Sequence, residues 1–125
     1  MYKFDIPALP ISVNKLYRPR TNRYGTVYVQ KNTQADDFTN IMHYTCKKPK
    51  QPIQKWIKAN IVFTFGSNKR FLMADIDNLM KVFFDALATC QIIENDRFVY
   101  EFTVKKVLGD EDSTSGFIEQ IDEIK

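Results

Sequence analysis

A chain of 125 residues with an apolar share of 44%, 10 Phe and 6 Tyr can bury one hydrophobic core, which favours a single domain over residues 1–125. No stretch approaches the roughly 18 apolar residues of a membrane span and no signal peptide is recognisable, so we expect a soluble cytoplasmic protein with no membrane partner. Two cysteines, Cys46 and Cys90, are too few and too far apart for a disulfide framework or a zinc site. We interpret both as buried free thiols.

The net charge of +3 conceals a steep gradient along the chain. Residues 1–70 hold 13 Lys and Arg against 3 Asp and Glu, a balance of +10, whereas residues 71–125 hold 5 against 12, a balance of −7. The gradient indicates a polyanionic partner for the basic part and a separate role for the acidic part. A solvated surface whose charges happen to segregate explains the gradient equally well.

Apolar residues that alternate predict strands, and apolar residues that recur every three to four positions predict helices. In the first half we expect a strand at 2–6, an ordered loop at 7–25 with a turn at Gly25, a strand at 26–30, and a helix from an N-cap at Thr33 to about Lys47. In the second half we expect a strand at 57–65, a loop at 66–74, a helix from Asp77 to about Cys90, a strand at 98–107, an acidic loop and a strand at 117–121.

Helices that fall between strands, with hairpin-like spacing at both ends, indicate an α+β fold. We expect two helices packed on one mixed, largely antiparallel sheet, in a single domain. The order of the strands within the sheet does not follow from the sequence.

An acidic cluster lies at the start of the second expected helix. Asp77 suits the N-cap position, but one cap does not explain Asp75 two residues earlier. Lys81 and Asp85 follow Asp77 at intervals of four, so the three share one helix face. A salt-bridge ladder is the simplest explanation of this spacing, yet the apolar neighbours leave little of the helix for solvent.

Asp96 lies in the turn "IENDRFV" between this helix and the next strand. A strand that returns beside the helix start would bring Asp96 near Asp75 and Asp77. Three converging carboxylates repel one another unless a cation joins them, and Mg²⁺ or Mn²⁺ prefers such oxygen ligands. An adjacent lysine, Lys81, can then stabilise charge that develops on a phosphate. These residues therefore indicate a metal-dependent phosphodiesterase.

The string "DIDNLMKVFFDAL" followed by "ENDRFV" resembles the signature of the RusA family of Holliday-junction resolvases. That signature is D-x-D-N-x-x-K-x-x-x-D-x-L followed by an acidic D-D-x-x-V turn. The segment "LPISVNKLYRPR" is similar to the family's P-x-S-x-N-x-x-Y-x-R opening. The matching residues are Pro10, Ser12, Asn14, Tyr17 and Arg18 in the opening, and Asp75, Asp77, Asn78, Lys81, Asp85, Leu87, Asp96 and Val99 in the signature.

The resemblance implies an α+β homodimer that cuts four-way DNA junctions symmetrically in the presence of Mg²⁺ or Mn²⁺, with no small-molecule cofactor besides the metal. It implies that Asp75, Asp77 and Asp96 bind the catalytic metal and that Lys81 is the catalytic lysine. The residues that we expect to contact DNA are Asn14, Tyr17, Arg18, Arg20, Lys69, Arg70, Asn78 and Lys81.

Two positions depart from the family pattern. The first acid of the acidic turn is Asn95 here, and the residue before the first aspartate, often basic in the family, is Ala74. Lys69 and Arg70 can supply the missing positive charge from the same loop. Tyr17 and Tyr24, interleaved with arginines, are placed to stack on exposed bases, although packing within the loop explains them equally well.

The sequence thus predicts a metal-dependent endonuclease that resolves four-way junctions by paired symmetric cleavage, from a bacterial or phage source and associated with the nucleoid when it acts. A junction-binding or DNA-architectural protein without catalytic activity is the alternative. A small interaction protein with no nucleic-acid role is the third possibility, and it predicts no DNA binding even at low salt.

Overall fold

The structure is a computed structural model that describes residues 1–11, 17–31 and 34–122, and for residues 17–20, 28–31 and 34–35 it describes the backbone alone. The strands are β1 (Tyr2–Ile6), β2 (Tyr17–Thr21), β3 (Val27–Lys31), β4 (Ile57–Phe65), β5 (Val99–Leu108) and β6 (Ser113–Gln120). The helices are α1 (Gln34–Thr45), α2 (Asn68–Met73) and α3 (Ile76–Thr89), with a 3-10 turn, η2, at Asp96–Phe98.

Four strands form a mixed sheet in the order β1-β6-β4-β5. β6 pairs antiparallel with both β1 and β4, whereas β5 runs parallel to β4. β4 lies between β6 and β5, and every second residue of it is buried, as the alternation in "IKANIVFTF" predicts. At Gly116, a Cβ would lie 1.8 Å from the Asn60 carbonyl oxygen of β4, so only glycine allows β6 this close.

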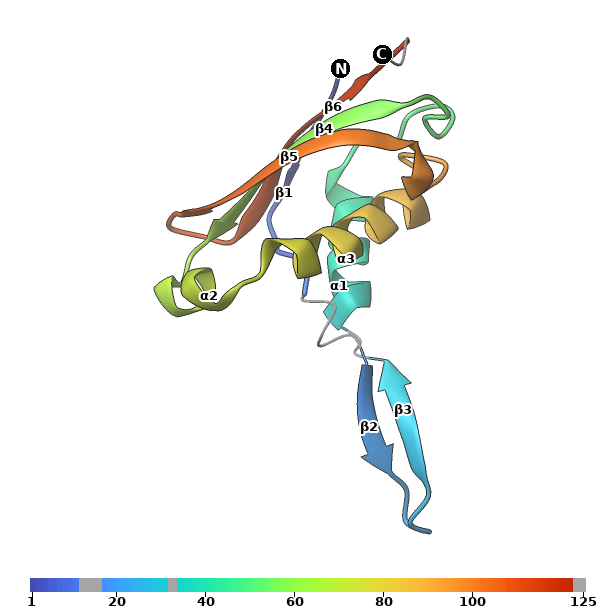
Figure 1. Cartoon of the computed structure of the whole chain (residues 1–125), viewed down its shortest axis with the longest axis vertical. Coiled ribbons are helices and arrows are strands. Elements are labelled where there is room, and N and C mark those ends of the chain that lie inside the picture. The colour runs from blue at the N-terminus through green and yellow to red at the C-terminus, as the bar shows by residue number, and fades with distance from the viewer. Residues whose placement is uncertain (12–16, 32–33, 123–125) are drawn as a thin grey trace.

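The helices cover one face of this sheet (Figure 1). Phe83 of α3 lies at the centre of the core, with ring centroids 5.4 Å from Phe4 and 6.2 Å from Phe63. Phe38 and Met42 of α1 are buried in the same cluster. The predicted α+β fold with a mixed, largely antiparallel sheet is confirmed, except that the described residues form three helices where two were expected.

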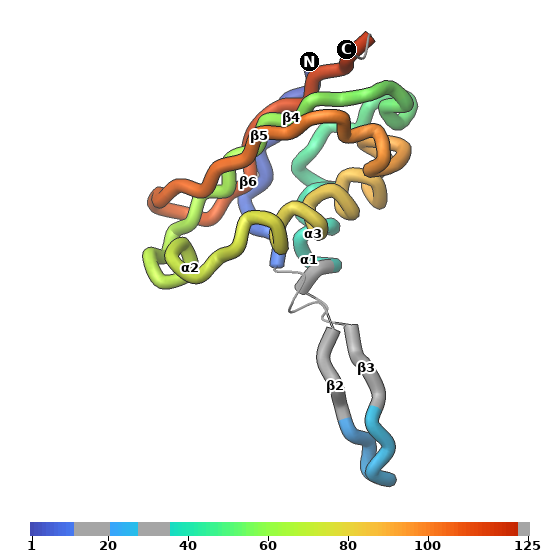
Figure 2. The backbone as a smooth tube through the Cα atoms, in the orientation of Figure 1, coloured from blue at the N-terminus to red at the C-terminus, as the bar shows by residue number. Residues whose placement is uncertain are grey.

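β2 and β3 form a separate two-stranded hairpin that extends away from the sheet and helices (Figure 1). Its turn is closed by the Asn22 side chain, whose Oδ1 accepts hydrogen bonds from the backbone N–H groups of Tyr24 at 2.9 Å and Thr26 at 3.0 Å. Gly25 adopts a φ of +81°, which glycine tolerates best. The tip at residues 21–27 is the part of the chain farthest from the sheet (Figure 2).

The predicted elements differ from the structure in four places. The loop expected at 7–25 contains β2. Proline, which lacks a backbone N–H donor, is tolerated at position 19 because β2 belongs to a two-stranded ribbon. The loop expected at 66–74 contains α2, the helix expected to reach Lys47 ends at Thr45, and the last strand begins at Ser113, before the expected 117. The predicted cap at Thr33 lies outside the described residues.

In the described part of the chain, no helix has both the length and the apolar character to cross a membrane. Cys46 and Cys90 are free thiols, as predicted, although only Cys90 is fully buried. Burial raises the pKa of both thiols, which keeps them protonated near neutral pH.

Candidate active site

The start of α3 carries two exposed carboxylates. Asp75, not Asp77 as the sequence suggested, is the N-cap residue, because the backbone is still extended there with φ −92° and ψ 119°. The Asp75 carboxylate makes no capping bond; it accepts a hydrogen bond of 3.4 Å from the side-chain amide of Asn78. Asp77 lies in the first helical turn, where the helix dipole favours an anion.

Lys106 of β5, which the sequence did not single out, fixes the approach to this helix start. Its Nζ donates hydrogen bonds to the carbonyl oxygens of Phe71 at 2.6 Å and Ala74 at 3.0 Å, and also lies over the Phe71 ring. Both carbonyl groups belong to the C-terminal end of α2, where Ala74 is the C-cap residue and directly precedes Asp75. Sequence offers no local signal for the contact, because it joins residues more than 30 positions apart.

Asp77, Lys81 and Asp85 form an exposed stripe along α3. The other faces of the helix are buried against the sheet and α1. Lys81 Nζ lies 3.9 Å from Asp85 Oδ1, so this half of the predicted ladder is present, although both side chains are more than half exposed. The helix therefore offers more surface to solvent than its apolar sequence suggested.

Asp96 lies at the start of η2, just before β5. The Asn95 side chain caps this turn by accepting a hydrogen bond of 2.9 Å from the backbone N–H of Arg97. Asn and Asp cap helical turns equally well, so an asparagine can replace the acid that the family pattern has at this position. Phe98 of the turn packs on Trp56, with ring centroids 5.8 Å apart.

Within one chain, Asp96 does not lie beside Asp75 and Asp77. α3 runs opposite to β5: Ala74, before the helix, contacts Lys106 near the end of β5, whereas Phe84 stacks on Phe102 near its beginning. A helix of 14 residues is about 21 Å long, so the return of the chain leaves Asp96 at the other end of α3. The expectation that the turn would return to the helix start is not met.

The chemistry of the donors at the helix start suits a hard cation. Mg²⁺ is commonly held by one or two carboxylates together with waters and substrate phosphates, and Asp75 and Asp77 supply two. Among the described residues, no group of three or more Asp, Glu, His or Cys side chains is arranged to hold a metal ion. The assignment of Asp75, Asp77 and Asp96 as metal ligands stays a prediction.

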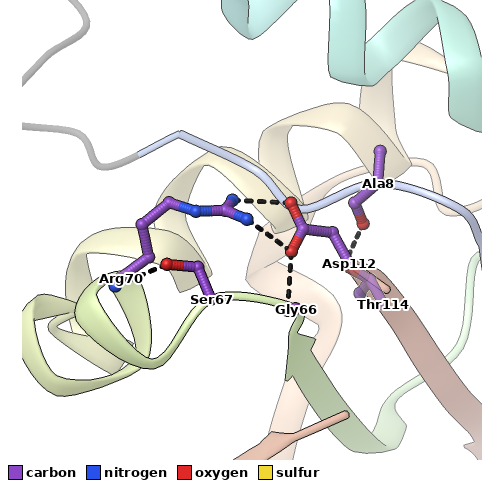
Figure 3. Close-up of polar contacts among 6 residues, drawn as sticks. All are labelled: Ala8, Gly66, Ser67, Arg70, Asp112 and Thr114. Carbon is purple, nitrogen blue, oxygen red and sulfur yellow. Dashed lines mark hydrogen bonds and ion pairs between the residues drawn. The ribbon is translucent and has the colours of Figure 1, made fainter. Parts of the chain in front are cut away.

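Arg70 of α2 has a partner within the chain. Its guanidinium donates two hydrogen bonds to the Asp112 carboxylate, at 2.6 Å and 2.8 Å, and Gly66 N–H donates a third to it (Figure 3). These bonds hold the pKa of Asp112 below its ordinary value. The contact ties α2 to the loop before β6, so the side chain predicted to bind DNA also has a structural role.

The remaining predicted DNA contacts belong to α2 and to the first part of the chain, which also holds Tyr24, the tyrosine expected to stack on bases. Lys69 is exposed on α2. At the hairpin tip, Arg23 donates a hydrogen bond of 2.8 Å to the Tyr24 hydroxyl and lies over its ring. Asn14 lies outside the described residues, and for Tyr17, Arg18 and Arg20 the structure gives the positions of the backbone in β2 and not of the side chains.

The described residues thus combine an exposed pair of carboxylates at a helix start, a lysine one helical turn later and a hairpin that carries arginines, on an α+β body. Residues 10–115 match the family model of the endodeoxyribonuclease RusA. This match covers most of the chain, so the protein belongs to the RusA family of Holliday-junction resolving endodeoxyribonucleases. In a comparison with curated proteins, no sequence matched the chain.

Proposed function

We propose that this protein is a divalent-metal-dependent endonuclease that binds four-way DNA junctions as a homodimer and cuts two strands at symmetric positions. The observation that carries the proposal is the exposed pair Asp75 and Asp77 at the start of α3, one helical turn before Lys81, in a chain of the RusA family. Mg²⁺ is the expected metal, with Mn²⁺ as a substitute.

The residues at the helix start have distinct roles in this proposal. The carboxylates of Asp75 and Asp77 would hold the metal, which when bound would supply Lewis-acid activation of the scissile phosphate and of the attacking water. Asn78 orients the Asp75 carboxylate through its hydrogen bond of 3.4 Å. The Lys81 ammonium, exposed on the same helix face, stabilises the negative charge that develops on the phosphate during displacement.

The basic part of the chain provides DNA affinity that does not depend on the metal. Basic residues of the hairpin and of α2 contact backbone phosphates, and these contacts position the junction without reading its sequence. Arg23 and Tyr24 at the hairpin tip present a cation and an aromatic ring together. Such a pair suits the unstacked bases at the centre of a junction.

The test compares the same isosteric change at two exposed aspartates. Asp77→Asn removes one ligand charge, so cleavage of a synthetic four-way junction in Mg²⁺ should fall by about two orders of magnitude or more. Asp110→Asn makes the same chemical change at an exposed carboxylate of the loop before β6 and should cleave normally. Junction affinity should hold or improve in Asp77→Asn, because repulsion between carboxylate and phosphate is relieved.

A junction-binding protein without catalytic activity is the second candidate. It is favoured by the single-chain geometry, in which no three carboxylates, His or Cys of the described residues are arranged for a metal. In that case the wild type binds a four-way junction at low salt and leaves it uncut in Mg²⁺ and in Mn²⁺. If the wild type cleaves the junction and Asp77→Asn cleaves it at the same rate, the assigned site is refuted.

A further inference from the structure

A group of aromatic side chains lies beside the turn that carries Asp96. Trp56, the only tryptophan of the chain, contacts Phe98 with ring centroids 5.8 Å apart and Tyr100 with ring centroids 6.4 Å apart. Among the described residues, none of these three belongs to the hydrophobic core cluster. Trp56 exposes 39% of its surface and Tyr100 exposes 42%. The indole therefore packs on the turn and on the start of β5 rather than in the core.

The turn η2 is short and exposed. It has three residues, and none of them is buried. Directly after it, the pairing of β5 with β4 shifts register between Ile57 and Lys58. The hydrogen bonds of the turn are local: the Asn95 side chain caps it, and the Phe98 N–H donates to the Asn95 carbonyl oxygen at 3.2 Å. Such bonds fix the shape of the turn but not its direction relative to the sheet.

Trp56, by contrast, is fixed to the framework of the fold. It directly precedes β4, and its carbonyl oxygen accepts a hydrogen bond of 2.7 Å from the Ile121 N–H, just after β6. Three residues earlier, the Ile53 N–H donates to the Ile92 carbonyl oxygen, and the Ile53 carbonyl oxygen accepts from the Glu94 N–H, both at 3.0 Å. The segment of Trp56 is thus tied both to β6 and to the chain before the turn.

The geometry of the turn connects Phe98 with Asp96. A 3-10 helix has about three residues per turn, so consecutive side chains project about 120° apart. Phe98 packs on Trp56 and is half-buried, whereas Asp96 and Arg97 are exposed. The Arg97 guanidinium also lies over the Phe98 ring, 4.9 Å from its centroid. Fixing the Phe98 side chain therefore fixes the direction in which the Asp96 carboxylate points.

We propose that Trp56 is a positioning residue for Asp96: the indole holds Phe98, and with it the whole turn, so that the carboxylate is presented in one direction. That Asp96 takes part in cleavage is itself a prediction and rests on the proposed function. Trp56 touches neither DNA nor metal. Loss of the indole should slow cleavage without weakening DNA binding, because a displacement of about 1 Å in a reacting group can cost about 100-fold in rate.

The contact with the turn is tested without any activity. Amide hydrogen exchange is measured at residues 95–100 in the wild type, Trp56→Ala and Trp56→Phe. Trp56→Ala should exchange about tenfold faster in this segment, because both ring contacts are lost. Trp56→Phe keeps an aromatic ring at the same place and should restore most of the protection. Exchange in the centre of β6 reports on the whole fold and should stay at the wild-type rate. An unchanged rate at residues 95–100 in Trp56→Ala overturns the proposal.

The effect on cleavage is measured with a synthetic four-way junction in Mg²⁺, with enzyme in excess. Trp56→Ala should cut about tenfold more slowly than the wild type and should need more Mg²⁺ for its half-maximal rate. Its junction affinity in EDTA should equal that of the wild type, and Trp56→Phe should recover most of the rate. Tyr44→Ala removes an aromatic side chain that is 87% exposed on α1, and as the control it should cut normally.

A double-mutant cycle tests whether Trp56 acts through Phe98. Phe98→Ala should slow cleavage about as much as Trp56→Ala does. The double variant should be no slower than the slower single variant, because both changes break the same contact. Losses that multiply in the double variant would mean that the two side chains act independently, which contradicts the proposal. If Trp56→Ala does not fold, Phe98→Ala and Trp56→Phe give the exchange and cleavage measurements in its place.

The outcomes separate this inference from the proposed function. If the wild type cuts junctions and Trp56→Ala cuts them at the same rate, the positioning role is refuted and the proposed function stands. If Trp56→Ala loses junction affinity as strongly as it loses rate, the indole touches DNA and the positioning role is equally refuted. If the wild type leaves junctions uncut, the proposed function fails, and the exchange measurement decides whether Trp56 holds the turn.

Discussion

At the scale of single residues, Asn95 illustrates why a sequence signature needs a structure beside it. The family pattern has an acid at this position, so the acidic turn has one negative charge fewer in this chain. The Asn95 side chain instead caps η2 through the Arg97 N–H. Because Asn fills this role as well as Asp, the turn that presents Asp96 retains its geometry without the extra charge.

The ion pair between Arg70 and Asp112 gives a prediction at the same scale. The Asp112 pKa is lower in the folded protein than its ordinary 3.8 because Arg70 donates to the carboxylate. A group of this kind stabilises the fold fully above its unfolded pKa, and that stabilisation is lost as the pH falls through the folded pKa. Arg70 is 54% exposed, so we expect about 1 kcal/mol or less.

Thermal melts of wild type and Asp112→Asn should therefore differ between pH 5 and 7, and the difference should shrink as the pH falls from about 3.8, the ordinary pKa of this carboxyl, through its lower pKa in the folded protein. The neighbouring change Asp110→Asn is the control and should melt like the wild type across the same range. If the difference in melting temperature between wild type and Asp112→Asn stayed constant down to pH 2.5, the ion pair with Arg70 would not be the cause of that difference.

At the scale of elements, α2 shows the limit of local sequence reasoning. It has six residues and none of them is buried, so it lacks the apolar periodicity by which helices are recognised. Ser67 does cap it, accepting a hydrogen bond from Arg70 N at 3.4 Å, and this was the available local signal. What holds the helix is contact with Asp112 and Lys106, far along the chain.

Other elements followed directly from the sequence. β4 matches its predicted bounds because alternate residues of 57–65 are apolar and buried, a pattern that no helix would satisfy. α3 begins within one residue of its predicted start because its apolar, buried residues recur every three to four positions. The position of Asp96 was not predictable, because it depends on β5 running parallel to β4, a choice made by the whole sheet.

Lys106 provides a prediction for the element that presents Asp75. Lys106→Met keeps most of the apolar stem but removes the bonds to the Phe71 and Ala74 carbonyls. Hydrogen exchange at residues 68–77 should accelerate about tenfold, the equivalent of about 1.4 kcal/mol from hydrogen bonds of a charged donor. Lys105→Met, one residue away on the opposite face, should leave exchange in this segment unchanged.

Junction cleavage by Lys106→Met should fall as well, because the approach to Asp75 is no longer fixed. The exchange measurement separates this positioning role from a general loss of fold, which would also accelerate exchange in the central strand β4. Unchanged exchange at residues 68–77 would show that α2 does not depend on the lysine.

At the scale of the whole molecule, charge and shape divide the protein into two parts. The sheet and helices carry the carboxylates, whereas the basic hairpin extends away from them (Figure 1). The cations of the hairpin attract the polyanion at a distance from the carboxylates, so their contribution to affinity does not depend on the charge of the site. Binding and cleavage should therefore respond separately to salt, to metal and to substitution.

Junction binding should be steeply salt-dependent and should not require a divalent metal. Phosphate contacts release condensed counterions, so the logarithm of affinity falls linearly with the logarithm of salt concentration, by about 0.9 per contact. Arg23→Ala, at the hairpin tip, should weaken binding to four-way junctions and reduce this slope by about 1. Filter-binding or anisotropy titrations in EDTA, from 50 to 200 mM salt, give both quantities.

Lys50→Ala is the matched control, because Lys50 is an exposed cation in the connection between α1 and β4 and does not belong to the hairpin. It should change neither affinity nor slope. If Lys50→Ala and Arg23→Ala reduce the slope equally, the whole basic surface attracts DNA and the hairpin has no special role. If Arg23→Ala leaves the slope unchanged while Lys50→Ala lowers it, DNA follows the connection before β4, and the hairpin tip is free of phosphate contacts.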